Sequence, residues 1–273
     1  MRPDRVWRTP WPWRRPSSDR AGPGLTGRLL VGTSGFSYPG WIPRLYPPGT
    51  PASRFLATYA SRFEAVELNN TFRRRPTAST IAGWLRATPE QFRFAIKAQR
   101  GSAVRALLGS AEDSVAWLAE PLPHFGAQLG AVLFEMPAEM RRDGPWCEGD
   151  TGRADAALAA ILQAWPATIP LVVELPDASW HVDETFAALR SVGATLCATD
   201  LQAGEEPTLR RTSSRHYLRL RRDDYGPAAL DAWANRLRPF LEAGDDVFVF
   251  FKHDPVGHAA ELAISFAERF ERG

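Results

Sequence analysis

The chain has 273 residues, of which 44% are hydrophobic and 23% are charged, and its formal net charge is +2. These values are typical of a soluble globular protein with a substantial core, and the length suits one large α/β domain or two small ones. No apolar run reaches the roughly 18 residues that a membrane span requires. We therefore expect no membrane partner.

The beginning of the chain lacks the apolar stretch of a secretory signal, so nothing in it predicts export. The two cysteines, Cys147 and Cys197, do not have the spacing of a metal site. Two isolated thiols suit a reducing compartment better than a disulfide framework. The sequence therefore predicts a cytoplasmic protein with free thiols.

Residues 1–26 differ in composition from the rest. They hold six Arg and two Asp, a net charge of +4, which leaves −2 for the remaining residues of a chain whose total is +2. Five prolines and no hydrophobic periodicity exclude a regular helix or a central strand, so we predict a disordered extension over 1–26 and a folded domain over 27–273. The extension interleaves Arg with Trp7, Trp11 and Trp13, a composition that can contact RNA or a partner, but an inert tail is the favoured interpretation. The mildly acidic body argues against a duplex-DNA binder.

Short apolar runs rich in Val, Leu, Phe or Ile recur along the domain, as in buried parallel strands. Eight of them are present: Leu29–Ser34, Ala65–Asn69, Arg93–Lys97, Ala131–Glu135, Leu171–Glu174, Thr195–Thr199, Tyr217–Leu220 and Val247–Phe251. Most are followed by apolar residues at helical spacing. We expect Thr77 and Ser110 to cap two of these helices, and Pro121 and Pro123 to kink or split the second.

Eight strands that alternate with helices, beginning about every 31 residues, predict a single-domain (β/α)8 TIM barrel. The alternative is an open doubly wound sheet, which needs a G-x-G-x-x-G turn after an early strand. The first strand instead ends in Gly32–Gly35, with no matching start of a helix. The barrel is therefore preferred, although the sixth and seventh strands are too close for more than a short helix.

Polar or ionisable residues end every predicted strand. In chain order they are Thr33 and Ser34; Glu67 and Asn69; Lys97; Glu135; Glu174 and Asp177; Asp200; Arg219 and Arg221; and Lys252, His253 and Asp254. Functional sites of barrels lie at the carboxyl ends of the strands, and charges there are costly unless they are paired. The ring therefore predicts a ligand site, with structural ion pairs such as Lys97 with Glu67 or Glu135 as the alternative.

The lysines are unusually few, since Lys97 and Lys252 are the only ones among 33 basic residues. Drift from Lys to Arg on the surface explains the general excess of arginine. Both remaining lysines fall at the ends of predicted strands, and a buried ammonium can change its pKa in a way that a guanidinium cannot. Their placement supports acid–base chemistry at the barrel mouth.

Two features predict that this mouth binds phosphate. Arg219 and Arg221 alternate along the seventh strand, so both side chains face the same side. Gly257 follows the eighth strand, where barrels commonly hold phosphate at the amino end of a helix. We therefore expect Lys97, Arg219 and the chain near Gly257 to bind an oxyanion.

A divalent metal is the weaker alternative at this mouth. The residues that could form a carboxylate-rich site for Mg or Mn are Glu135, Glu174, Asp200, His253 and Asp254. No H-E-x-x-H motif and no paired cysteines are present, so no cofactor is predicted.

Three motifs resemble the opening signatures of the YecE-like family, also called domain of unknown function 72: Val31–Trp41, Val66–Phe72 and Phe92–Lys97. Four further segments follow in the family's order: Ala131–Phe134, Glu174–Trp180, Gly193–Asp200 and Tyr217–Leu220. The match runs from about residue 29 to 268. The resemblance implies a TIM barrel and a family without an established activity.

The chain also departs from that family's pattern on the rim. Ser102–Val104 stands where the family usually has Ile-Thr-His, and the Glu174–Trp180 segment lacks the usual Arg. Glu135 replaces a usual Gln, Arg221 replaces a usual His, and the usual paired Asn of the eighth strand are replaced near Lys252-His253. These departures allow a divergent or non-catalytic member.

The leading hypothesis is an enzyme that acts by acid–base chemistry on a small phosphorylated or otherwise anionic substrate. Lys97 and Glu174 form the expected proton-transfer pair. Glu67 and Asp200 orient them, and Arg219 binds the anion. The other candidate ligand-binding residues are Thr33, Ser34, Tyr38, Trp41, Asn69, Glu135, Trp180, Arg221, Lys252, His253 and Gly257.

Two alternatives remain open. One is a non-catalytic barrel that binds an anionic ligand or a nucleic-acid end, and the other is a metal-dependent hydrolase or isomerase. The sequence does not predict the oligomeric state.

Overall fold

The computed structural model describes residues 25–204 and 206–271. Eight parallel strands form one sheet in the order β1-β8-β7-β6-β5-β4-β3-β2. Their bounds are β1 Leu29–Thr33, β2 Ala65–Leu68, β3 Arg93–Lys97, β4 Leu129–Glu135, β5 Leu171–Glu174, β6 Thr195–Asp200, β7 Arg215–Leu220 and β8 Asp246–Phe251. A bridge between Ser34 and Glu67 joins the two outer strands and closes the ring, so the predicted (β/α)8 barrel is confirmed.

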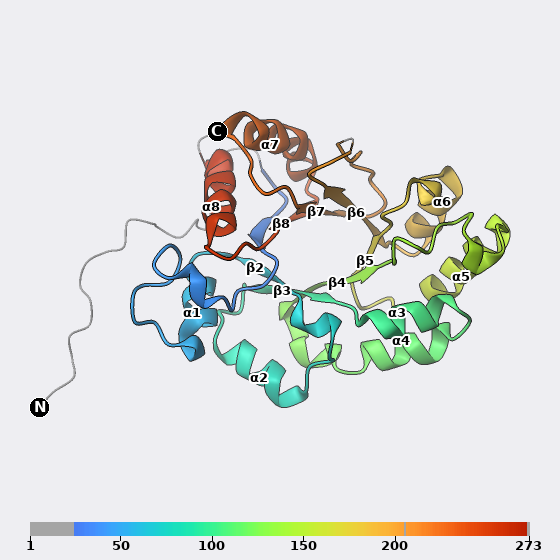
Figure 1. Cartoon of the computed structure of the whole chain (residues 1–273), viewed down its shortest axis with the longest axis horizontal. Helices are drawn as coiled ribbons and strands as arrows, with labels where there is room; N and C mark the ends of the chain where they lie inside the picture. The colour runs from blue at the N-terminus through green and yellow to red at the C-terminus, as the bar shows by residue number, and fades with distance from the viewer. Residues whose placement is uncertain (1–24, 205, 272–273) are drawn as a thin grey trace, which may run out of the picture.

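Helices surround this ring in Figure 1. They are α1 Phe55–Ala60, α2 Ala78–Arg86, α3 Arg100–Leu107, α4 Ala111–Ala119, α5 Thr151–Ala164, α6 Asp183–Ser191, α7 Pro227–Glu242 and α8 His258–Glu271. Short 3-10 turns lie in the connections, at Pro39–Trp41, Ala52–Arg54, Asn70–Phe72, Leu122–Gln128, Pro145–Cys147 and Ala178–Trp180. Two α-helices follow β3, whereas the described part of the β6–β7 connection contains none, as its short length predicts.

Local sequence signals explain several helix ends. The Thr77 hydroxyl accepts a hydrogen bond from the Thr80 N–H and caps α2 as expected. Ser110 occupies the same position before α4, but its side chain makes no capping bond, so that prediction is wrong. Helix α4 ends at Ala119, before Pro121, and a 3-10 turn continues the chain, which confirms the predicted break.

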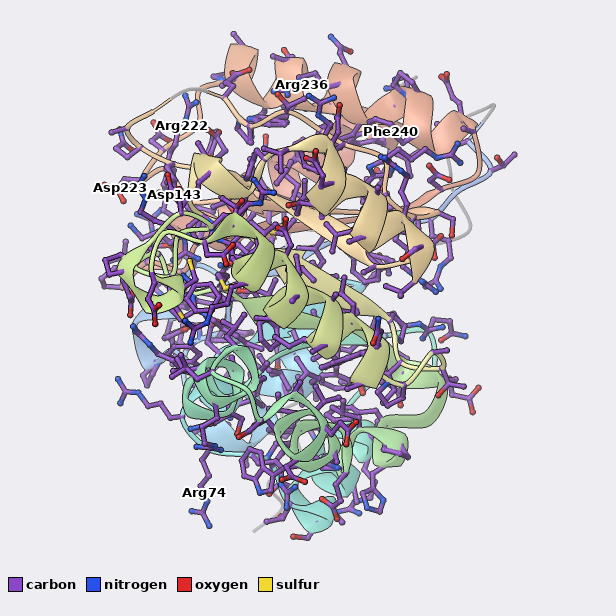
Figure 2. All side chains as sticks on the ribbon, turned by 90° about the vertical axis from the view of Figure 1, so that its right-hand side faces the viewer. Arg74, Asp143, Arg222, Asp223, Arg236 and Phe240 are labelled. Carbon is purple, nitrogen blue, oxygen red and sulfur yellow. The ribbon has the colours of Figure 1, made fainter. Side chains whose placement is uncertain are left out.

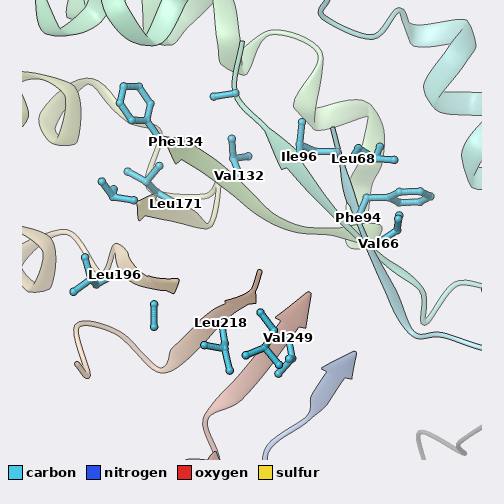
Figure 3. Close-up of a cluster of buried hydrophobic side chains, with 14 of the residues drawn as sticks. Val66, Leu68, Phe94, Ile96, Val132, Phe134, Leu171, Leu196, Leu218 and Val249 are labelled. Carbon is cyan, nitrogen blue, oxygen red and sulfur yellow. The ribbon is translucent and has the colours of Figure 1, made fainter. Parts of the chain in front are cut away.

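The alternation of side chains along each strand divides the core into two layers. One side of the strands supplies the barrel interior, formed by Leu30, Ala65, Ala95, Ala131, Leu133, Val172, Cys197, Tyr217, Phe248 and Phe250. Figure 3 shows the alternate residues, among them Val66, Phe94 and Leu218, in the larger cluster between the sheet and the helices. Residues one position before or after each interior residue therefore belong to the outer layer.

Most of the predicted extension, residues 1–24, lies outside the described residues. Its last two residues belong to the folded body, because the N–H of Thr26 donates to Leu241 at the end of α7. Gly27 donates to the same carbonyl. Within residues 25–204 and 206–271, no helix has the length and apolar character of a membrane span.

Both cysteines are buried and free, as expected. Cys197 lies in the barrel interior, where burial raises the pKa of its thiol well above the ordinary value. We predict that an aromatic disulfide reagent will modify neither thiol in the native protein, because the thiolate is the reacting form and the reagent has no access. Spectrophotometric titration should count two thiols in denaturant without reductant. Fewer than two would indicate a disulfide and contradict the prediction of a reducing compartment.

Candidate functional site

One buried arginine lies at the centre of the polar ring. The guanidinium of Arg219, on β7, donates from Nη1 to Glu174 at 2.5 Å and to Glu135 at 3.1 Å, and from Nη2 to Glu67 at 3.0 Å. Its side chain is only 3% exposed. Three strands thus direct a carboxylate to one cation, because their last inward-facing positions meet at the carboxyl end of the barrel. Within the described part of the chain, the buried Nε of Arg219 has no partner.

Glu67 is the most enclosed of the three acids, with no exposed surface. It accepts hydrogen bonds from the Ser34 hydroxyl at 2.7 Å and the Tyr217 hydroxyl at 2.8 Å. Burial tends to raise the pKa of Glu67, but Arg219 and the two hydroxyl donors outweigh burial and hold the pKa below its ordinary value. Glu67 is therefore an ionised group whose hydrogen bonds hold Arg219 in place at the centre of the ring.

Glu135 and Glu174 are neighbours in the register of β4 and β5, and both accept a hydrogen bond from Arg219 Nη1. Burial raises the pKa of Glu174, and the nearby Glu135 charge adds to this effect against the opposing charge of Arg219. Burial also acts on Glu135, but its bond with Lys97 prevails and lowers the pKa of Glu135. The two adjacent carboxyl groups therefore favour different protonation states.

Lys97 pairs with Glu135, which the sequence named as an alternative ion pair, and not with Glu174, the leading expectation. Its Nζ lies 2.5 Å from Glu135 Oε2 and 4.3 Å from the centre of the Phe72 ring. Glu174 instead accepts a hydrogen bond from Thr199 on β6, at 2.5 Å, besides the bond from Arg219. The expected proton-transfer pair is thus a triad in which Glu135 lies between Lys97 and Glu174.

The outer rim carries an aromatic pair and a cation. The rings of Tyr38 and His253 stack with centroids 4.9 Å apart, and the Tyr38 hydroxyl donates to the Ser34 carbonyl at 3.1 Å. Burial raises the pKa of Tyr38 to about 12. Burial and the Arg221 charge both lower the pKa of His253, so this ring is neutral near neutral pH. Among the described residues, the half-buried Arg221 side chain has no hydrogen bond or ion pair, although its charge also lowers the pKa of Glu67.

Several predicted site residues face away from this cluster. Asp200 is the residue after the inward-facing Thr199, and its carboxylate accepts from Arg222 at 2.7 Å and from Trp233 of α7 at 3.1 Å. Its expected role as an orienting group in the mouth is therefore wrong. Figure 2 shows Arg222 and Asp223 at the end of the molecule formed by the loops after the strands.

Thr33 and the two candidate tryptophans also have structural partners. The Thr33 hydroxyl donates to Gly35 and lies 3.0 Å from the Tyr59 hydroxyl. The fully buried Trp41 and Trp180 donate from Nε1 to the carbonyls of Asp254 and Met140. These three side chains fix the loops of the rim and do not present their polar atoms to the mouth. Asn69 follows β2 at the rim and is half-buried.

The predicted oxyanion donors are occupied by the chain's own carboxylates. Asp254 accepts from the backbone N–H groups of residues 256 to 259 at the start of α8, including Gly257 at 2.7 Å. Glycine is needed there because its φ is 88° and a Cβ would lie 3.2 Å from the Trp41 ring. Lys252 pairs with the exposed Asp223 at 2.9 Å. The structure thus does not bring Lys97, Arg219 and Gly257 together as free donors.

The described residues contain no group of three or more His, Cys, Asp and Glu side chains arranged to hold a metal ion. The three central glutamates surround a guanidinium instead. Sequence reasoning did not single out Tyr217 and Thr199, which bond to Glu67 and Glu174. Strand alternation contained the signal, since Tyr217 precedes Arg219 by two positions and Thr199 precedes the outward-facing Asp200 by one.

The fold and this cluster define a (β/α)8 barrel protein with an ionisable centre at the carboxyl ends of its strands. The chain belongs to the family described as protein of unknown function DUF72, whose model matches residues 30–273. It is 26% identical over 249 residues to the UPF0759 protein YunF of Bacillus subtilis, covering 80% of this chain and 86% of that protein.

Solved structures agree with this assignment. A DUF72 family protein of Thermotoga maritima aligns with a TM-score of 0.74 and 25% identity, covering 89% of this chain and 99% of the other. A DUF72 family protein of Enterococcus faecalis aligns with a TM-score of 0.72 and 19% identity, covering 89% and 95%. The second likeness concerns the fold alone.

Proposed function

We propose that this chain is an enzyme that transfers protons to and from a small anionic substrate at the mouth of the barrel. The observation that carries the proposal is the adjacent pair Glu135 and Glu174, which share the donor Arg219 Nη1 and whose pKa values shift in opposite directions. Two titratable groups whose pKa values are shifted in opposite directions can act as a base and an acid at the same pH.

The exposure of the two groups assigns their roles. The Glu135 side chain is 28% exposed and Glu174 is 7% exposed, so Glu135 is the carboxylate that a substrate reaches. Glu135, as the carboxylate, takes a proton from the substrate, and Glu174, as the acid, gives its own proton to the product. A proton then passes from Glu135 to Glu174 and restores both groups to their starting states. Lys97, 12% exposed beside Glu135, supplies a positive charge where a substrate anion would develop.

Arg221 is the proposed anchor for the anionic group of the substrate. Both Nη atoms of Arg219 are bonded to glutamates, whereas the Arg221 side chain has no partner among the described residues and is half-buried at the same rim. The stacked Tyr38 and His253 rings border the rim beside it. The anion expected from the sequence at Arg219 is thus proposed at Arg221, and the reaction uses only side chains of this chain.

The test is solvent deuterium exchange. Sugar phosphates and small phosphorylated or carboxylated compounds are incubated with the protein in D2O, and mass spectrometry detects deuterium incorporation. For a compound that exchanges, Arg221→Ala should weaken binding about ten- to a hundredfold, because a charge-assisted contact contributes about 1.5–3 kcal/mol. Lys252→Ala is the matched control, since it removes a rim cation that is already paired with Asp223.

Two results would contradict the proposal. If Arg221→Ala and Lys252→Ala bind the compound equally well, the anion does not bind at Arg221. If compounds raise the melting temperature of the wild-type protein but none exchanges deuterium, the barrel is a binding module and not an enzyme of this type.

A further inference from the structure

A polar cavity lies outside the mouth, beside the connection from β2 to α2. It has a volume of about 550 Å³, and its lining includes Arg73, Arg74, Arg75, Trp117, Glu120 and His124. Volumes of this size accommodate small organic ligands. A much smaller cavity, bordered by Arg75, Gln99 and Lys97, lies between it and the central cluster. The larger cavity, here called the arginine groove, is therefore a separate site.

Three consecutive arginines give the arginine groove its charge. Only Arg75 has an acidic partner, Glu120 at 3.2 Å, and it also donates to the Trp117 carbonyl at 2.6 Å. In the described part of the chain, the exposed side chains of Arg73 and Arg74 have no hydrogen bond or ion pair. Figure 2 shows Arg74 extending away from the body of the molecule. Two adjacent free guanidinium groups repel one another, and an anion between them would remove that cost.

Trp117 provides a different recognition element in the arginine groove. It lies on α4 and is 39% exposed, which is unusual for so large an apolar side chain. The guanidinium of Arg75 lies 4.5 Å from the centre of its ring and covers part of the indole. The contact, together with the bond from Arg75 to the Trp117 backbone, orients the ring while leaving surface for a planar partner.

We propose that the arginine groove binds a nucleotide unit, with its phosphate on Arg73 and Arg74 and its base against Trp117. Arginines that contact phosphate, together with an exposed aromatic ring that stacks on a base, are the combination by which proteins hold single nucleotides and single strands. A free nucleotide and a nucleotide within a single strand present the same chemistry. The inference is independent of the proposed reaction at the mouth.

The test compares three probes on the full chain. Fluorescence anisotropy measures a labelled oligo-dT of about ten nucleotides, a length within the range of known single-strand sites. Calorimetry measures AMP and inorganic phosphate. Wild-type protein should bind AMP and the oligonucleotide more tightly than inorganic phosphate. Comparable affinity for AMP and the oligonucleotide identifies a free nucleotide, and a preference above tenfold for the oligonucleotide identifies a strand.

The double variant Arg73→Ala/Arg74→Ala should lower the affinity for the tighter probe about ten- to a hundredfold. For the oligonucleotide, the slope of log affinity against log salt should also fall by about 1.4, because each lost phosphate contact removes about 0.7. Trp117→Leu should lower the affinity for AMP and the oligonucleotide about tenfold and leave inorganic phosphate unchanged.

Arg54→Ala/Arg190→Ala is the matched control, because it removes two exposed arginines that have no partner among the described residues and lie outside the groove. An equal loss in the control and the groove variant would show non-specific charge attraction and overturn the proposal. It is also overturned if no probe binds the wild type, or if Trp117→Leu binds AMP as the wild type does.

Discussion

Replacing Arg219 by methionine is expected to lower the free energy of unfolding by about 3–5 kcal/mol, because removing one partner of a buried ion pair leaves uncompensated charge behind. Here a single guanidinium bonds to Glu67, Glu135 and Glu174, and the first and last of these are almost fully buried. For a domain of this size, such a loss corresponds to a decrease in melting temperature on the order of 10 °C. Denaturant unfolding at neutral pH and calorimetry measure the effect.

Arg221→Met is the control for this experiment, since it removes a cation from the same rim that has no ion pair within the described residues. Its effect on the free energy of unfolding should stay within about 0.5 kcal/mol. The destabilisation of Arg219→Met should diminish as the pH falls through the carboxyl range, because protonated glutamates need no counter-charge. If the two variants are equally stable at neutral pH, Arg219 is not a structural counter-ion. The sequence-based prediction that Arg219 binds an anion would then be preferred.

The barrel could be predicted from the sequence because its signals are local. Eight apolar runs with helical patterns between them appear within short windows, and β3 and β5 have the predicted bounds. The membership of the polar ring was also predictable, since the strand ends of a parallel barrel lie at one rim. Glu67, Glu135, Glu174 and Arg219 were all singled out, and they do meet.

The sequence offered several partners for Lys97 but could not choose among them, because the choice depends on the relative register of the strands. The ion pair with Glu135, named as an alternative, is the one that forms, and the expected pair with Glu174 is not. Alternation along a strand, in contrast, could have excluded Asp200, since it follows the inward-facing Thr199 directly. The Asp254 carboxylate accepts hydrogen bonds from backbone N–H groups at the start of α8. These bonds depend on the conformation of the loop after β8, which no strand or helix pattern predicts.

The same substitution at two glutamates should change the stability by very different amounts. Glu67→Gln is expected to lower the free energy of unfolding by about 3–5 kcal/mol, because Glu67 is ionised, has no exposed surface, and accepts bonds from Arg219, Ser34 and Tyr217. An amide in its place offers only one acceptor oxygen and no charge. Glu174→Gln imitates the protonated form that burial already favours, so its cost should be about 1 kcal/mol or less.

Their pH dependence should differ in sign. The depressed pKa of Glu67 contributes stability above the unfolded-state pKa of about 4.3, and this stability is lost as the pH falls. The deficit of Glu67→Gln relative to wild type should therefore shrink in acid. The raised pKa of Glu174 contributes stability that is present below that value and is lost as the pH rises through the folded-state pKa. The stability of Glu174→Gln relative to wild type should therefore improve as the pH increases.

The activity of Glu174→Gln then separates catalysis from folding. On a compound that exchanges deuterium with the wild type, we expect the rate at saturating substrate to fall by about 10²–10⁴-fold, because the amide can neither give a proton to the substrate nor take up the one that Glu135 removes. Substrate affinity should change little, since Arg221, the proposed anchor, remains. A well-folded Glu174→Gln protein that exchanges at the wild-type rate would show that Glu174 takes no part in proton transfer. Glu135 and Lys97 would then have to hold the proton between them, and the raised pKa of Glu174 would only reflect its burial beside Arg219.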